Sequence, residues 1–192
     1  MSVFEWFFLA EFTVVMAMRF WFARRMGEKR VVARHLDLGE RLLLAATFVG
    51  MMFVPLIYFC TPWLGFADYG PQAWFGWAGI PCGVVAVVLF WRSHADLGAN
   101  WSATLEIREQ HTIVDTGVYR YLRHPMYASI WLWVISQALL LPNWLAALAG
   151  AASFAPMFFL RVAREEQATA SGFRAAYVAC MSRSGRDWAR GW

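Results

Sequence analysis

The chain has 192 residues, a hydrophobic content of 60% and a formal net charge of +4 at pH 7. This length is typical of one domain, whereas the hydrophobic content and the twelve tryptophans exclude an ordinary soluble domain. We therefore expect a single, all-α integral membrane domain over residues 1–192, with three N-terminal spans in 1–91 and a C-terminal half, 92–192, that carries most of the polar motifs.

Apolar runs predict the membrane spans. The first candidate is residues 3–23, although charged residues that include Glu11 and Arg19 interrupt it. Residues 42–60 and 73–91 contain no charged residue, and each approaches the roughly 20 residues that cross a bilayer core. Intramembrane acids are often functional, so Glu11 is either a functional group or the partner of another helix.

The next apolar run, residues 128–160, is too long for one simple span. Pro142-Asn143 divides it, and we expect a tight helical hairpin there. The first arm, 128–141, would reach only about 21 Å at 1.5 Å per residue. To span, it must extend back through Met126 or lie in a locally thinned bilayer. The sequence thus predicts about five spans, followed by a C-terminal helix over residues 165–181.

The distribution of positive charge predicts the topology. All 17 Lys and Arg residues lie in three blocks, 19–41, 92–123 and 161–190, and the alternate connections contain none. The positive-inside rule makes these blocks cytoplasmic, with the N-terminus outside and the C-terminus inside, which requires an odd number of spans. The net charge therefore reflects topology and attraction to anionic lipid and does not indicate a nucleic-acid partner.

Polar side chains gather at both feet of the expected hairpin. Residues 117–129, GVYRYLRHPMYAS, precede it, and Arg161, Arg164, Glu165 and Glu166 follow where the apolar run ends. Such an arrangement indicates a site at the membrane surface, as an enzyme with a water-soluble cofactor and a lipophilic substrate requires. No cysteine or histidine spacing indicates a metal site.

The segment 117–129 resembles the GxYxxxRHPxYxG motif of the isoprenylcysteine carboxyl methyltransferase family, which belongs to a wider group that includes phospholipid N-methyltransferases. Glu165-Glu166 falls where the family carries paired acidic residues after its final hairpin. The upstream LGANWS and the hairpin LWLWVISQALLLPNW are most similar to the short five-span prokaryotic members. The match covers roughly 92–187, and Ser129 replaces the glycine of many members.

The resemblance implies methyl transfer from S-adenosylmethionine, with S-adenosylhomocysteine as product, at the cytoplasmic side of a prokaryotic inner membrane. Residues 92–192 then form the catalytic half. A lipophilic acceptor would enter from the bilayer. The carboxylate of an isoprenylated cysteine is preferred, and a phospholipid amine or a thiol is the alternative. No metal, nucleic acid or obligate protein partner is expected.

The resemblance also assigns the cofactor site to residues from both feet of the hairpin: His94, Gly117, Tyr119, Arg123, His124, Pro125, Tyr127, Glu165 and Glu166. Donors of the RHP turn, Arg123 and His124, can serve the cofactor's carboxylate. The acidic pair can face its ammonium or sulfonium charge, and the aromatic side chains can hold its adenine.

Three residues are expected to be catalytic: Arg161, Arg164 and Glu165. A carboxylate acceptor is already ionised near neutral pH, so it needs an orienting arginine and no general base. Arg161 is preferred for this role because it lies closer to the membrane boundary. An amine or thiol acceptor would instead need His124 or a glutamate as a base.

Simpler interpretations compete with these roles. Arg123 and Arg164 are also explained as positive-inside anchors, Pro125 as a helix start, and His94 as a structural residue. Two other classes remain: a non-enzymatic membrane module, and a nicotinamide-dependent reductase, whose known members with a similar C-terminal region are considerably longer.

Overall fold

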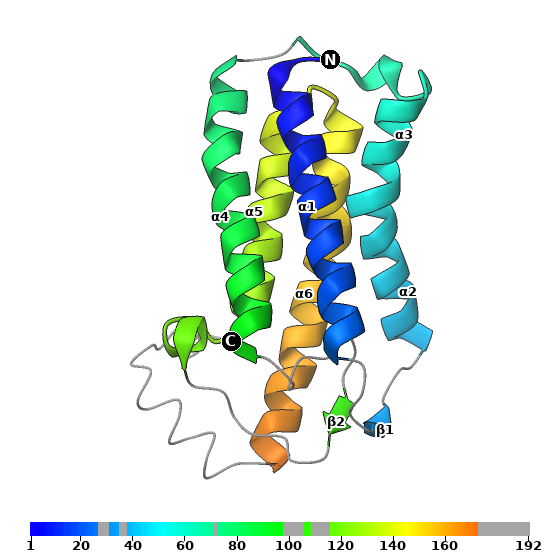
Figure 1. Cartoon of the computed structure of the whole chain (residues 1–192). Helices are drawn as coiled ribbons and strands as arrows, with labels where there is room; N and C mark the ends of the chain where they lie inside the picture. Colours follow the sequence, from blue (N-terminus) through cyan, green and yellow to red (C-terminus); the bar gives the residue numbers. More distant parts are fainter. Residues whose placement is uncertain (27–30, 35–37, 71–72, 98–105, 109–115, 173–192) are drawn as a thin grey trace.

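The protein is an all-α membrane bundle. The structure, a computed structural model, describes residues 1–26, 31–34, 38–70, 73–97, 106–108 and 116–172, and for 25, 26, 31–34, 106–108 and 163–172 it describes the backbone alone. The main helical elements are α1 (Val3–Met26), α2 (Leu38–Phe48), the π-helix η1 (Val49–Phe53), α3 (Val54–Cys60), α4 (Ala73–Leu97), α5 (Pro125–Leu140) and α6 (Trp144–Gly172) (Figure 1).

The helices confirm the expected number of spans. Four segments are long and apolar enough to cross a membrane: 3–24, 38–60, 73–97 and 144–162. The fifth, α5, is a shorter apolar helix that begins at Pro125 and so extends back through Met126, as its length requires. The structure describes only part of the C-terminal helix expected over residues 165–181. Residues 165–172 continue α6 without a break, and residues beyond 172 lie outside the described part.

The α5–α6 hairpin is fixed at its turn by the connection between α3 and α4. Asn143 is fully buried, and its side-chain amide donates to the Leu64 carbonyl and to Asp68 Oδ1, both at 2.7 Å. Its Oδ1 accepts from the Ala146 N–H at 3.0 Å, which caps the first turn of α6. One side chain therefore starts a helix and anchors a loop, and we call this end of the bundle the turn end.

The opposite end, where α1 and α4 finish and α5 begins, is here called the motif end. Two short strands, β1 (Val31–Arg34) and β2 (Glu106–Arg108), pair antiparallel there, below the helices in Figure 1. The pairing of β1 with β2 joins two of the basic blocks of the sequence, 19–41 and 92–123. This pairing was not expected from the sequence, because strand pairing between distant segments leaves no local pattern.

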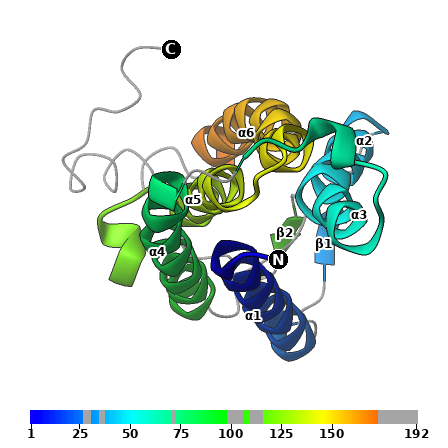
Figure 2. The same cartoon turned by 90° about the horizontal axis from the view of Figure 1, so that it is seen from above.

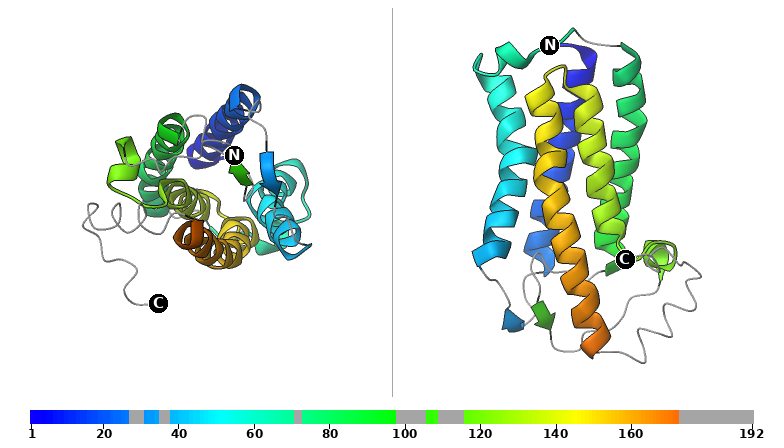
Figure 3. Two further views of the ribbon diagram at one scale, coloured as in Figure 1. Left: turned by 90° about the horizontal axis from the view of Figure 1, so that it is seen from below. Right: turned by 180° about the vertical axis from the view of Figure 1, so that it is seen from behind.

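In the bundle, α5 contacts both α4 and α6, while α1 packs on α4 and α5 and α2 packs on α6 (Figure 2). Figure 3, seen from behind, shows α5 and α6 side by side. Glycines permit close approach of α4, since a Cβ on Gly83 would lie 2.6 Å from Glu11 Oε2. Glu11 Oε2 accepts a hydrogen bond from buried Ser136 at 2.9 Å, so the intramembrane acid joins α1 to α5.

Candidate active site

The RHP turn is the start of α5. His124 occupies the N-cap position, and Pro125 is the first helical residue, where its missing N–H costs no helical hydrogen bond. The buried ring of Tyr127 lies 5.6 Å from the ring of His124 and 5.7 Å, edge to face, from that of Phe158 on α6. The turn is thus held on both helices of the hairpin.

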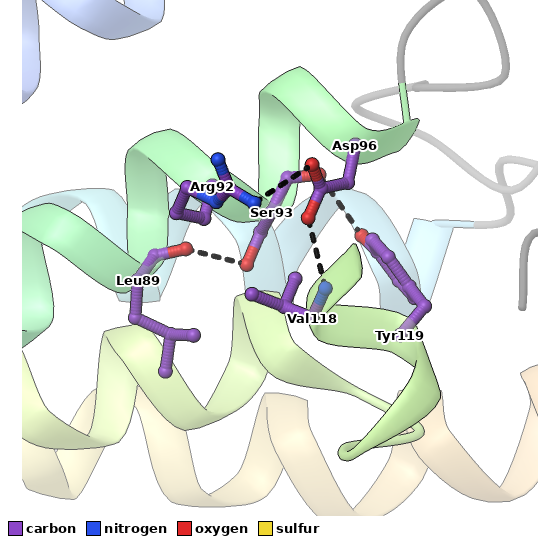
Figure 4. Close-up of polar contacts among 6 residues, drawn as sticks. All are labelled: Leu89, Arg92, Ser93, Asp96, Val118 and Tyr119. Atoms are coloured by element: carbon purple, nitrogen blue, oxygen red, sulfur yellow. Dashed lines mark hydrogen bonds and ion pairs between the residues drawn. The ribbon is translucent and has the colours of Figure 1, made fainter. Parts of the chain in front are cut away.

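The last turns of α4 hold the segment before the RHP turn, the 3₁₀ helix η4 (Gly117–Arg120). Asp96 Oδ2 accepts from the Val118 N–H at 2.8 Å, and Tyr119 donates to the Ser93 carbonyl at 3.2 Å (Figure 4). Arg92 lies 3.7 Å from the other oxygen of Asp96. Gly117 has a φ of 60° and passes against Asp96 so closely that no side chain fits there.

A cavity of about 430 Å³ opens toward the motif end between α1, α2, α5 and α6. This volume lies within the range of small-molecule sites, about 300–1,000 Å³. Its polar lining comprises Arg19, Thr47, Tyr119, Arg123, His124, Tyr127 and Arg161. Its apolar lining comprises Val15, Met16, Leu44, Phe48, Met51, Met52, Phe90, Leu97, Pro125, Met126, Ile130, Trp133 and Met157.

The lining changes character along the bundle axis. Arg161 lies one helical turn nearer the motif end than Met157, and Arg19 one turn nearer than Val15. Trp133 is two turns inside the start of α5 at Pro125. The cavity therefore has basic groups toward the motif end and an apolar interior, which suits a ligand with a charged head and a lipophilic chain.

Most of the candidate residues that have described side chains meet at this cavity. Six line it: Tyr119, Arg123, His124, Pro125, Tyr127 and Arg161. Gly117 does not line it and instead positions η4 against Asp96. The side chains of Arg164, Glu165 and Glu166 lie outside the described part, although their backbone continues α6 beyond Arg161.

His94 lies on α4 directly after Ser93, whose carbonyl accepts the hydrogen bond from Tyr119. Its ring is buried between Phe22 of α1 and Phe90 of α4, with centroid distances of 4.8 and 4.3 Å, and Nδ1 contacts the Phe90 carbonyl at 2.9 Å. It is not among the cavity-lining residues. These contacts favour the structural interpretation of His94 over a direct contact with the cofactor.

The sequence motifs do not identify Arg19 as a residue of the cavity. It comes from α1, far from the motif in sequence, and lines the same cavity as Arg161. The available signal was a cation inside an otherwise apolar span, a feature that marks a functional suspect.

Comparison with known protein families matches part of the chain. Residues 79–171 match the model of the isoprenylcysteine carboxyl methyltransferase family, a region that contains most of α4, the RHP turn and Arg161. The match covers just under half of the chain. The matched region begins earlier and ends earlier than the resemblance at 92–187 suggested, and it excludes α1 and α2, which form the other wall of the cavity.

The names of similar proteins agree with this family match. Protein-S-isoprenylcysteine O-methyltransferase B of Arabidopsis thaliana is 24% identical over 139 residues, which cover 71% of each chain. Protein-S-isoprenylcysteine O-methyltransferase of Dictyostelium discoideum is 29% identical over 104 residues, 53% of this chain and 44% of the relative. A probable enzyme of the same name from Oryza sativa subsp. indica is 23% identical over 142 residues. The names of all three describe protein-S-isoprenylcysteine O-methyltransferases.

Proposed function

We propose that this protein is a methyltransferase that uses S-adenosylmethionine to esterify the carboxylate of a lipophilic, isoprenylcysteine-like acid at the cytosolic face of a prokaryotic inner membrane. The observation that carries the proposal is the cavity of about 430 Å³ that joins the RHP turn and Arg161 to an apolar interior. The family and the relatives' names support the same reaction.

The residues at the motif end fit the cofactor. Its carboxylate would be held by Arg123 and His124, and its adenine by the aromatic wall that includes Tyr119 and Tyr127. The Glu165-Glu166 pair follows Arg161 by about one helical turn, where its negative charge would offset the cofactor's ammonium or sulfonium. When bound, S-adenosylmethionine would supply an electrophilic methyl group, which bonds to an acceptor oxygen as its bond to sulfur breaks and S-adenosylhomocysteine leaves.

The protein's part in the reaction is alignment, since a carboxylate is ionised at neutral pH and no proton has to be removed. Arg161 would orient the acceptor by charge-assisted hydrogen bonds. The apolar side chains next to it, such as Met157 and Trp133, would hold the lipid chain and keep water out of the site. His124 then acts as a binding residue and not as a base.

Methyl transfer to defined acceptors tests the proposal. The purified protein in liposomes would receive methyl-labelled S-adenosylmethionine with a farnesylcysteine acid, a phosphatidylethanolamine or an alkyl thiol. We expect a base-labile methyl ester on the acid alone. Label on the amine or the thiol alone would contradict the carboxyl assignment, and failure to bind S-adenosylhomocysteine would favour a non-enzymatic module.

A matched pair of variants tests the site within the same assay. Arg123→Gln removes a cavity guanidinium and should lower cofactor affinity at least tenfold, because hydrogen bonds between charged groups contribute about 1.5–3 kcal/mol. Arg120→Gln alters an exposed arginine in the same segment, whose guanidinium lies 6.0 Å from the Tyr121 ring, and should leave cofactor affinity unchanged. Equal effects of the two substitutions would remove the role assigned to Arg123.

A further inference from the structure

Arg19 is a charged residue of α1 that faces the methyl-transfer cavity. It lies inside the apolar segment 3–24, where a cation is costly unless it meets a partner or water. Among the residues that the structure describes, none forms a hydrogen bond or an ion pair with it. Arg19 is outside the region that matches the family, so the family motif assigns it no role.

The charged side chains among the described lining residues of the cavity are all basic. Arg19, Arg123 and Arg161 line it from three different helices or their starts, and no acidic side chain is among its described lining residues. Arg19 and Arg161 carry like charges and line the same cavity, one from α1 and the other from α6. The acid on α1, Glu11, lies eight residues from Arg19, or about 12 Å along the helix, and binds Ser136.

Such a cluster favours an anion. Bringing like charges together in a region of low dielectric is unfavourable, and a ligand carboxylate relieves that repulsion when it binds. Guanidinium groups present planar pairs of N–H donors that match the two oxygens of a carboxylate. The cofactor's own carboxylate is assigned to Arg123 and His124 of the RHP turn, and Arg19 and Arg161 present two further guanidinium groups to the same cavity.

We infer that Arg19 binds the acceptor's carboxylate together with Arg161 and thereby selects a lipophilic acid over its neutral analogues. This inference rests on the proposed function. Arg19 is a specificity-determining residue in this view, because it sets which head group the cavity accepts. An amine or neutral acceptor would bring no negative charge to Arg19.

The position of Arg19 on α1 also aligns the acceptor. Val15 and Met16 precede it by four and three residues, so all three lie on one face of the helix, and all three line the cavity. An acceptor whose carboxylate meets Arg19 therefore has its chain beside Val15 and directed toward Trp133 in the interior. One face of α1 would contact both the head group of the acceptor and the beginning of its chain.

The test compares two ligands that differ in one group: a farnesyl thioether carboxylic acid and its carboxamide. Binding is followed by quenching of tryptophan fluorescence, to which Trp133 of the cavity wall contributes. We expect the unmodified protein to bind the acid at least tenfold more tightly than the amide. Arg19→Gln should reduce this ratio to less than about threefold by weakening binding of the acid, with affinity for the amide and for S-adenosylhomocysteine unchanged.

The control is Arg24→Gln. Arg24 is an exposed arginine of the same helix whose guanidinium lies 4.1 Å from the Phe20 ring, and its substitution should leave the acid-to-amide ratio intact. If Arg19→Gln does not fold, Arg19→Lys keeps the charge but loses the paired donors, and the ratio should fall to an intermediate value.

The outcomes separate the inference from the proposed function. An unchanged ratio in Arg19→Gln, or in Arg19→Lys where that variant is used, overturns the role of Arg19 even if the unmodified protein methylates the acid. If Arg19→Gln loses the preference for the acid over the amide and the unmodified protein forms no methyl ester, the acid-binding role of Arg19 stands. The proposed reaction is then overturned instead.

Discussion

At the scale of single residues, the site depends on how Gly117 meets Asp96. The positive φ of Gly117 turns its backbone so that the Val118 N–H points at Asp96 Oδ2, and the absence of a side chain lets the carboxylate approach. Tyr119, the second residue after Gly117, lines the cavity. The backbone conformation at one glycine therefore positions the segment that leads into the RHP turn.

Replacing this glycine tests that dependence. Gly117→Ala adds a Cβ that meets the Asp96 carboxylate, and the left-handed conformation costs a residue with a side chain about 1–2 kcal/mol. We expect affinity for S-adenosylhomocysteine to fall at least fivefold, measured by calorimetry. Gly70→Ala, at a position where no atom lies within 4 Å of the added Cβ, is the control. Equal affinities of the two variants would show that η4 does not position the site.

Some residues of the cavity can be predicted from the local sequence, and others cannot. Arg123, His124 and Tyr127 lie within five residues of one motif, and all three line the cavity, whereas their assignment to the cofactor stays a prediction. Arg19 reaches the same cavity from α1, a placement that depends on how α1 packs against α4 and α5. No local pattern records such packing, and Arg19 was recognisable only as a charge inside a span.

At the scale of elements, the π-helix η1 shapes the interior of the cavity. Met51 and Met52 are consecutive in η1, and both line the cavity. Five of the nine methionines line it, and methionine side chains adapt to chains of different shape. The interior is therefore suited to flexible lipid chains of more than one length.

A larger side chain in η1 should shorten the chain that the cavity accepts. Met51→Trp is expected to lower kcat/KM for a geranylgeranyl acceptor at least tenfold more than for a geranyl acceptor, because each excluded methylene costs about 1–3 kcal/mol. Phe53→Trp is the matched control, since Phe53 belongs to η1, is exposed and does not line the cavity. A uniform decrease across chain lengths would place the chain elsewhere.

The elements themselves were largely predictable. Uncharged runs located the spans, and Pro142-Asn143 located the hairpin turn, because exclusion of charge and a break in helix periodicity are local properties. The π-helical geometry of 49–53 and the pairing of Val31 with Arg108 were not predicted. Both depend on contacts between segments that are distant in sequence.

At the scale of the whole molecule, the two walls of the cavity differ in whether they lie inside the region that matches the family. The wall formed by α5 and α6 lies within the family match at 79–171, whereas α1 and α2 lie outside it. The family match therefore includes Arg161 and the RHP turn, whereas the N-terminal helices add Arg19 and much of the apolar interior. In the proposed function the acceptor would contact both walls, and substitutions in α1 or α2 could change its recognition while the RHP turn is retained.

The proposed reaction also requires the motif end to face the cytosol, where the cofactor is made. The connection 61–72 carries no Lys or Arg, whereas Arg120 and Arg123 lie at the motif end, so the positive-inside rule places the turn end outside. In a variant lacking Cys60, Cys82 and Cys180, we expect a cysteine introduced by Trp63→Cys to react with an impermeant maleimide in intact spheroplasts.

A cysteine introduced by Arg120→Cys should react with the same reagent only after permeabilisation. Both positions are exposed in the structure, so a difference in labelling reports the side of the membrane and not burial in the protein. The reverse pattern would place Arg123, His124 and Arg161 on the outer side, away from the cofactor. It would then overturn the proposed reaction at this site even if the cavity binds lipophilic acids.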